Sequence, residues 1–449
     1  MTTAPPLKTR GLLSNSIATL ASNHISAVLG YLFWMVSARS VSASAIGLSN
    51  TVISAMTLCA ILSVAGFMPL LTRVMPGASR EERSGLCSTA FVVCAVVSGT
   101  AGVVGALLLP DRVRAAIGAA WLVPLMAFGT MGTALGFVVG AALLGIRRAE
   151  LGLVGGVVGS LLRLVAVPVM LFFGIIVAGT SASAAHTILT AWVASFLICF
   201  AVCVWLLARA TPGFRFRPGW IWLSRLRGPV KWDHIATLAI RSPTFVVPIL
   251  AAAIFPPAEV GYMAMSALIS SAFFAVAAAV SNALLAQCAD GRERLGAEVR
   301  RALRLIGVLL VGPVVITCLL APKLLGFFGA DYARYSSLLV LLLLCSFPDA
   351  LSNIAVAILR VQHRLVAVTA VTVTGAALTI GGSWLLMPRL GILGAGWSAL
   401  ASQMIVAITF AVLVLRARFK TATDCNADEP LAMASAGPSR LRKIWIGRP

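Results

Sequence analysis

Twelve long apolar runs follow one another along this chain of 449 residues. Each run holds about 20 residues or more, which is enough for a helix to cross roughly 30 Å of hydrocarbon. The runs do not alternate polar and apolar residues, so we expect helices rather than the strands of a barrel. They lie at about 12–37, 45–71, 85–109, 115–144, 151–177, 185–208, 233–255, 260–286, 303–321, 335–358, 365–387 and 392–415.

The composition excludes a single soluble domain. Hydrophobic residues make up 60% of the chain and charged residues only 11%, with a mean hydropathy of +0.99. This leaves too little polar surface to cover a folded chain of this size in water. The first run lacks a clear cleavage site of small residues, so we expect it to remain as a span. The sequence therefore predicts an all-α polytopic membrane protein with twelve transmembrane helices.

The cysteines do not indicate a metal site. There are 9 of them, but no two have CxxC spacing, and those within the apolar runs have no histidine nearby. No phosphate-binding GxxxxGK[ST] loop is present, so we do not expect this chain to hydrolyse ATP. Neither a metal nor a cofactor is expected.

The basic residues are explained by topology. With both termini on one side of the membrane, that side receives 27 of the 35 Lys and Arg residues, and two lie within spans. Loops rich in Lys and Arg stay in the cytoplasm, so both termini are predicted to be cytoplasmic in a bacterial plasma membrane. Such loops also suit membrane lipids with anionic headgroups, and no nucleic-acid partner is needed. The other side holds Arg39, Arg112, Arg114, Lys323, Arg334 and Arg389.

Residues 209–232 form the longest internal loop and divide the spans into six and six. This loop interleaves arginines with Trp220, Trp222 and Trp232, which favours a linker lying at the membrane interface. The expected domains are a cytoplasmic N-terminus (1–11), an N-terminal six-helix bundle (12–208), the linker (209–232), a C-terminal six-helix bundle (233–416) and a disordered cytoplasmic tail (417–449).

Two matches in sequence indicate that one half repeats the other. Ser16 to Ser22 reads SIATLAS and His234 to Ile240 reads HIATLAI, at an offset of 218 (234 − 16). In the next run of each half, Gly47 and Gly261 occupy corresponding places at an offset of 214 (261 − 47). Parallel repeats commonly enclose a substrate path at their interface. We therefore predict two pseudo-symmetric six-helix bundles around a central cavity.

Two regions carry a resemblance to a known family. Residues 46–77 resemble the second-helix region of polysaccharide-exporter, Wzx-like oligosaccharide flippases, and residues 319–364 and 385–403 resemble their second bundle. The family pattern P-x-x-L-x-x-F-G-x-x-Y is matched by Pro322, Leu325, Phe328, Gly329 and Tyr332. The pattern P-x-x-G-I-x-G-A-x-x-A is matched by Pro388, Gly391, Ile392, Gly394, Ala395 and Ala399. The resemblance covers about residues 10–416 and implies the multidrug/oligosaccharidyl-lipid/polysaccharide (MOP) superfamily, whose members alternate access between two six-helix bundles.

Charged residues inside spans are the first candidates for a site, because they are costly in lipid and should face the bundle interior. Arg163 lies about 12 residues inside the fifth span, too deep to snorkel comfortably. Arg241 lies about eight residues inside the seventh span, where cavity lining and interfacial anchoring both remain open. Asp349 stands in the tenth span, with Asn353 one helical turn away. Asp349 either forms a structural ion pair with one of these arginines or responds to a proton or cation.

The first span supplies the remaining candidates, Asn15, Asn23 and His24. Under the offset of 218, Asn23 aligns with Arg241 (241 − 218 = 23), which places both on equivalent helices facing one cavity. A single histidine in a helix is also commonly a hydrogen-bonded packing residue, and this alternative stays open for His24.

Two buried arginines against one buried carboxylate predict a mildly cationic cavity. Such a cavity suits an anionic cargo, since arginine can hold a phosphate through two parallel hydrogen bonds. We therefore expect a flippase that moves a polyprenyl-diphosphate-linked oligosaccharide, a precursor of cell-envelope polysaccharide, across the plasma membrane by alternating access. Its expected partners are this lipid-linked glycan, membrane lipids and polysaccharide biosynthesis enzymes.

Two alternatives remain from the sequence. The first is a multidrug or small-molecule secondary exporter of the same superfamily. The second is a membrane-embedded polysaccharide polymerase or ligase, which would need catalytic side chains on the outer face. The predicted outer loops are short and nearly devoid of histidines and carboxylates, so we do not expect an enzyme.

Overall fold

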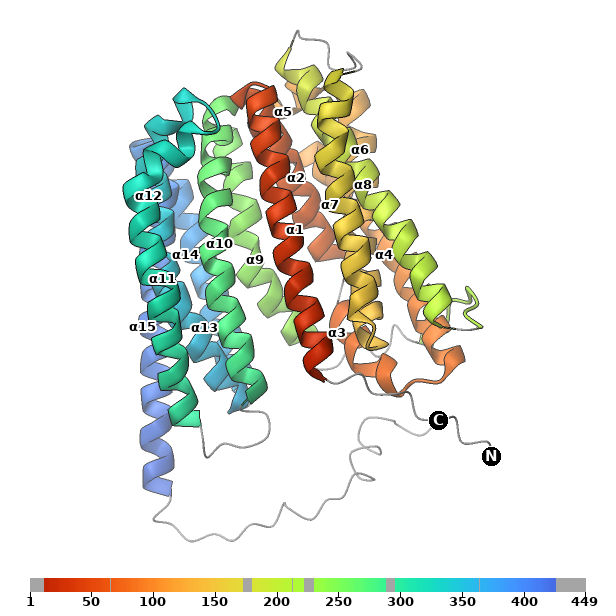
Figure 1. Ribbon diagram of the computed structural model, residues 1–449, viewed down its shortest axis with the longest axis vertical. Helices are drawn as coiled ribbons and strands as arrows, with labels where there is room; N and C mark the ends of the chain where they lie inside the picture. Colours follow the sequence, from red (N-terminus) through yellow and green to blue (C-terminus); the bar gives the residue numbers. More distant parts are fainter. Residues whose placement is uncertain are drawn as a thin grey trace.

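The computed structural model describes residues 12–64, 66–172, 180–211, 213–221, 230–287, 295–362 and 364–424. These residues form helices joined by short connections, and no strand occurs among them (Figure 1). The first half contains α1 (Leu12–Ser40), α2 (Ala43–Ser63), α3 (Phe67–Val74), α4 (Arg80–Leu108), α5 (Asp111–Ile117), α6 (Ala119–Gly145), α7 (Ala149–Phe172) and α8 (Ser181–Ala210). The second half contains α9 (Val230–Ile254), α10 (Pro257–Gln287), α11 (Leu295–Gly326), the 3-10 helix η3 (Ala330–Tyr335), α12 (Ser336–Leu344), α13 (Ser346–Val361), α14 (Leu365–Leu390) and α15 (Leu393–Asp424).

The predicted spans are confirmed along the described chain. Eleven helical segments are long and apolar enough to cross a membrane, and each coincides with one of the predicted runs. The remaining run falls on α1, whose side chains up to residue 24 lie outside the described residues. The tenth run is divided between α12 and α13 at Cys345. Pro348 accounts for this break, because it has no N–H to donate to the carbonyl one turn earlier.

The two halves repeat at an offset of 214 in their first two helices. Helices α1 and α9 end at Ser40 and Ile254 (254 − 40 = 214), and α2 and α10 begin at Ala43 and Pro257 (257 − 43 = 214). The offset shifts further along the chain, since α7 and α14 begin at Ala149 and Leu365 (365 − 149 = 216) and α8 and α15 begin at Ser181 and Leu393 (393 − 181 = 212). Packing repeats as well, because α1 lies on α7 as α9 lies on α14, and α6 lies on α8 as α13 lies on α15. The predicted pseudo-symmetric bundles are therefore confirmed.

At the ends of α1 and α9 the offset is 214, four residues or about one helical turn less than the 218 of the SIATLAS match. An offset of 214 pairs Arg241 with Ala27 (241 − 214), whereas 218 pairs it with Asn23. The pairing of Arg241 with Asn23 stays a prediction.

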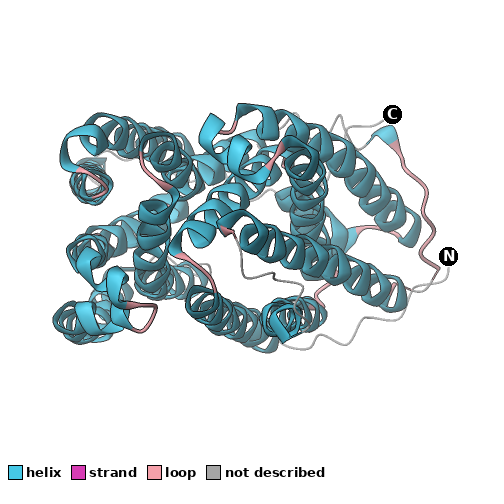
Figure 2. Ribbon diagram, turned by 90° about the horizontal axis from the view of Figure 1, so that it is seen from above, coloured by secondary structure: helices cyan, strands magenta, loops and turns pink. Residues whose placement is uncertain are grey.

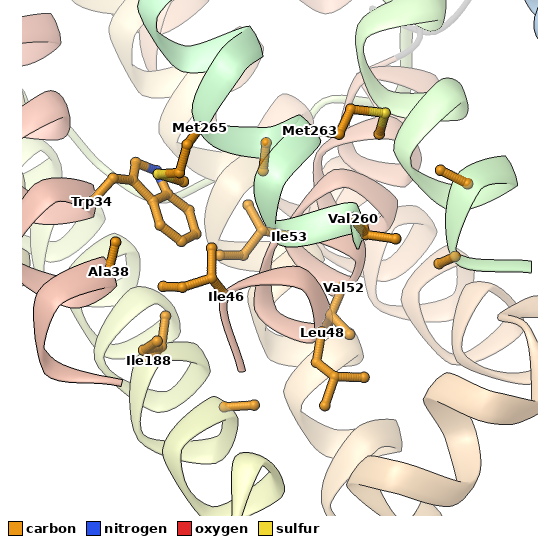
Figure 3. Close-up of a cluster of buried hydrophobic side chains, with 14 of the residues drawn as sticks. Trp34, Ala38, Ile46, Leu48, Val52, Ile53, Ile188, Val260, Met263 and Met265 are labelled. Atoms are coloured by element: carbon orange, nitrogen blue, oxygen red, sulfur yellow. The ribbon is translucent and has the colours of Figure 1, made fainter. Parts of the chain in front are cut away.

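The halves meet through α2, which packs against α9 and α10 of the second half. The boundary between the halves, which we call the seam, is bordered by α1, α2, α9 and α10. Figure 2 looks down on the molecule from above and shows its helices packed side by side. The main hydrophobic core crosses it, with Trp34 of α1, Ile46 and Val52 of α2, and Val260 and Met265 of α10 all at most 8% exposed (Figure 3).

Two ends of the molecule are distinguished below. The terminal end is the end at which α1 begins and α15 ends, and the distal end is the opposite one, where α1 ends and α2 begins (Figure 1). Helices α9 and α10 repeat this arrangement in the second half, so α10 also begins at the distal end.

The described part of the linker lies along the beginning of α4. The backbone N–H groups of Arg215, Arg217 and Gly219 donate to the hydroxyl oxygens of Ser84, Ser88 and Thr89, at 3.3, 3.1 and 2.8 Å. These hydroxyls satisfy backbone donors that would otherwise be unpaired at the edge of the membrane. Trp220 is 61% exposed beside them, whereas the side chains of Trp222 and Trp232 lie outside the described residues.

Candidate functional site

A cavity of about 240 Å³ lies within the second bundle. It is enclosed by α9, α10, α13, α14 and α15, of which α9 and α10 also border the seam. Apolar side chains such as Val406 and Phe410 form part of its wall. Its principal polar lining residues are Asp349, Asn353, Arg360, Thr379, Ser402 and Gln403.

Asp349 and Asn353 are brought together on α13 as the sequence predicted. The Nδ2 group of Asn353 donates to Oδ2 of Asp349 at 2.9 Å and to the Asp349 carbonyl oxygen at 3.0 Å. The hydroxyl of Ser281 on α10 donates to the Asn353 carbonyl oxygen at 2.6 Å. Asp349 stands in the first turn of α13, where the helix dipole favours a negative charge. The carboxylate is therefore held in one orientation at the cavity wall.

Asp349 makes no ion pair within the described chain, so the alternative of a structural pair with Arg163 or Arg241 is wrong there. A carboxylate without an ion-pairing partner in a membrane-embedded cavity can take up a proton or a small cation. Amide and hydroxyl oxygens at the cavity wall can act as further ligands of such a cation.

Sequence analysis missed several cavity residues. Arg360 was counted only among the basic loop residues, although it lies eleven positions after Asp349 on the same face of α13. Thr372 and Thr379, seven positions apart, line the cavity from one face of α14. A search for polar residues recurring at multiples of a helical turn within the apolar runs could have found this set.

Arg163 lies in the first bundle, on α7, and does not line this cavity. Its Nε donates to the Gly159 carbonyl oxygen at 3.2 Å, and one terminal nitrogen lies 3.2 Å from the Ser160 hydroxyl oxygen. The guanidinium also lies 4.5 Å from the ring centre of Trp192 and 5.0 Å from that of Phe196, both on α8. The negative faces of these rings help to compensate the positive charge of this half-buried side chain.

Arg241 is exposed and faces away from the cavity. The cavity residues on α9 include Ala239 and Pro243, and at 100° per residue Arg241 is turned about 160° from both. His234, two helical turns earlier on the same face as Arg241, hydrogen-bonds through its imidazole to the backbone of Leu62 on α2. Arg241 thus occupies the side of α9 that faces the first bundle.

The structure does not test the candidates in the first span. Asn15, Asn23 and His24 belong to α1, but their side chains lie outside the described residues. Their contribution to a site stays a prediction.

No protein-family profile and no curated protein sequence matches the chain, but solved structures match nearly all of it. The inward-facing conformation of a multidrug resistance MATE family transporter of the MOP superfamily has a TM-score of 0.68 at 15% identity, over 92% of this chain and 100% of that one. The inward closed conformation of the lipid II flippase MurJ has a TM-score of 0.67 at 12% identity, over 90% of this chain and 87% of that one. The chain has the fold of a MOP-superfamily transporter.

An outward-facing MATE family transporter of the same superfamily has a lower TM-score of 0.58, at 17% identity over 91% of this chain and 95% of that one. These matches confirm the predicted helical architecture. They include both a multidrug resistance transporter and a lipid II flippase, so the function has to be argued from this chain's own residues.

Proposed function

We propose that this protein is a flippase for a polyprenyl-diphosphate-linked oligosaccharide, moving it from the inner to the outer leaflet of a bacterial plasma membrane. The observation that carries the proposal is the placement of Arg241, exposed on the face of α9 turned toward the first bundle. An exposed guanidinium at this seam provides a planar set of donors that suits a diphosphate.

The charge balance along the seam supports an anionic cargo. The helices α1, α2, α9 and α10 that border it contain only two carboxylates in sequence, Asp233 and Glu259. Both stand within the first four residues of their helices, so neither lies deep in the membrane. A cationic cargo would meet no buried negative charge along this path, whereas a diphosphate would meet Arg241.

In the proposed cycle the sugar and diphosphate pass between the halves while the lipid tail stays in the bilayer. The terminal end faces the cytoplasm, because the loops there carry most of the basic residues. Asp349 has a separate role as a proton- or cation-responsive group in the second bundle, where uptake and release would bias the equilibrium between the two orientations of the halves.

The test replaces Arg241 with glutamine in cells whose surface glycan depends on this protein. We expect lipid-linked oligosaccharide to accumulate on the inner leaflet, with normal amounts of folded protein in the membrane. Arg241→Lys should retain part of the activity, since a point charge replaces the planar fork. Arg304→Gln, which removes an exposed arginine on α11 away from the seam, is the matched control. Full glycan export by Arg241→Gln would end the proposal.

A second candidate function is secondary export of a cationic small molecule. The observation that favours it is the carboxylate of Asp349 in a cavity of about 240 Å³ without an ion-pairing partner in the described chain. Cells that express the protein would then resist cationic dyes, and Asp349→Asn would abolish this resistance while Arg241→Gln would leave it intact. The glycan flippase predicts no such resistance.

A further inference from the structure

The two halves touch at the distal end through a reciprocal glycine contact. A Cβ added to Gly47 of α2 would collide with the carbonyl oxygen of Pro257, and one added to Gly261 of α10 would collide with the carbonyl oxygen of Ala43. Both partners obey the offset of 214 (261 − 47 and 257 − 43). The same contact is therefore made twice, once from each side of the pseudo-two-fold axis. Only glycine allows the helix backbones to approach so closely.

Two arginines of the first half flank this contact and cap helix ends of the second half. Nε of Arg39, at the end of α1, donates to the Phe327 carbonyl oxygen at 2.7 Å. A terminal nitrogen of Arg112, on α5, donates to the Ile254 carbonyl oxygen at 3.4 Å. Ile254 is the last residue of α9, and Phe327 follows the last residue of α11. Carbonyls at a helix C-terminus lack helical partners and carry the negative end of the dipole, so each is suited to a cation.

Both donors belong to the first half and both acceptors to the second. At the ends of α1 and α9 the offset is 214, so Arg39 corresponds to Ala253 (253 − 39 = 214), which has no side-chain donor. The cap from Arg39 is therefore not repeated by the equivalent residue of the second half.

An aromatic contact ties the same segments together. The ring of Tyr31 on α1 meets the ring of Phe328 edge-on, with centroids 6.0 Å apart. Phe328 in turn packs near Tyr332 of η3. Movement of α1 away from the second half must therefore separate this ring pair together with the neighbouring bond from Arg39 to Phe327.

We propose that Arg39 and Arg112 are positioning residues that latch the distal end shut around the glycine contact, and that both must release their carbonyls when the transporter opens at this end. The inference rests on the alternating access of the proposed function but not on the nature of the cargo. Arg39 and Arg112 are both exposed, so water can replace each bond on release and the cost of opening stays small. The latch is thus reversible.

The test is hydrogen–deuterium exchange on the full-length protein in lipid nanodiscs without any cargo. The variants are Arg39→Gln, Arg112→Gln and the double variant. The matched control is Arg389→Gln, which removes an exposed arginine at the distal end of α14, inside the second half. In the double variant we expect about tenfold faster exchange at residues 43–47 and 257–261, equivalent to about 1.4 kcal/mol.

A latch predicts a second, opposite change at the terminal end. When the distal end opens, the seam around Leu62 and His234 should close, so its exchange should slow. The double lysine variant keeps both charges and a donor at each site, and it should restore most of the original pattern. If the double variant exchanges as slowly as Arg389→Gln at the distal end, the latch is overturned. Faster exchange at the distal end without slower exchange at the terminal end would also overturn it, because this pattern indicates lost packing. Because no cargo is present, either result leaves the flippase proposal standing, and failure of the Arg241 test leaves the latch standing.

Discussion

The two bundles share one architecture, but they use the space between their fifth and sixth spans differently. In the first bundle, Trp192 and Phe196 of α8 pack on the guanidinium of Arg163. On α15, the corresponding helix of the second bundle, Val406 and Phe410 instead line the cavity. The first bundle fills the region around Arg163 with side chains, whereas the second leaves a cavity beside its last helix.

The chemistry follows the same division. Asp349 of the cavity stands on α13. The corresponding helix of the first bundle, α6, places Leu135 and Val138 in a hydrophobic core. The two copies therefore share helices but surround them with different side chains.

The largest expected effect comes from removing the charge of Asp349. Asp349→Asn keeps the size of the side chain and can still hydrogen-bond to Asn353, but it removes the charge that would take up a proton or cation. We expect transport to fall tenfold to a hundredfold, about the size of a typical coupling between two sites, with unchanged thermal stability. Transport assays in proteoliposomes, beside the melting temperature of the purified protein, measure both. Unchanged transport would show that the chamber has no part in the cycle.

Changing side-chain size on the last helix of each bundle tests the comparison directly. Trp192→Val removes a large ring beneath Arg163, and we expect it to destabilise the first bundle by about 3 kcal/mol, as for other large-to-small core changes. The reciprocal Val406→Trp enters an existing cavity, so it should cost less stability and mainly reduce transport. Denaturation of each variant gives the two energies. Equal losses of stability would contradict the contrast between a filled and a hollow bundle.

The glycine contact should respond alike from both sides. Gly47→Ala and Gly261→Ala each place a methyl group against a backbone carbonyl of the other half, and overpacking of this kind costs about 1–3 kcal/mol. We expect the two variants to lose similar amounts of stability and of transport activity. Gly381→Ala on α14, where an added Cβ meets open space, serves as the control. A loss confined to one variant would show that the contact is not symmetric in function.

The smallest effect is expected at Arg163. Arg163→Lys keeps the charge but loses the flat guanidinium that lies over two aromatic rings. We expect this to lower the free energy of unfolding by about 1 kcal/mol. Because Arg163 does not line the cavity, transport per folded molecule should stay close to normal. A strong transport defect in a stable Arg163→Lys protein would return this residue to the cargo path predicted from the sequence.

The fold could be predicted from the sequence because lipid imposes a length and an apolar surface on every span. The offset between the halves could not be predicted from two matches, since it is 214 at the ends of α1 and α9 but 216 at the starts of α7 and α14. Asp349 and Asn353 were predicted together because a four-residue spacing on one helix guarantees that they meet. The partners of Arg163, Trp192 and Phe196, could not be predicted because they come from the next span. Sequence spacing within one helix does not indicate which aromatic side chains of another will face it.

The caps from Arg39 and Arg112 also set how the distal end responds to its medium. Each cap joins a cationic guanidinium to a backbone carbonyl oxygen. Both arginines are exposed, so the ions of the medium have access to each bond. Added salt, which screens exposed charges within about 10 Å at 0.1 M, is the variable that should loosen it. A closure held by these two caps is therefore best suited to a medium of low ionic strength.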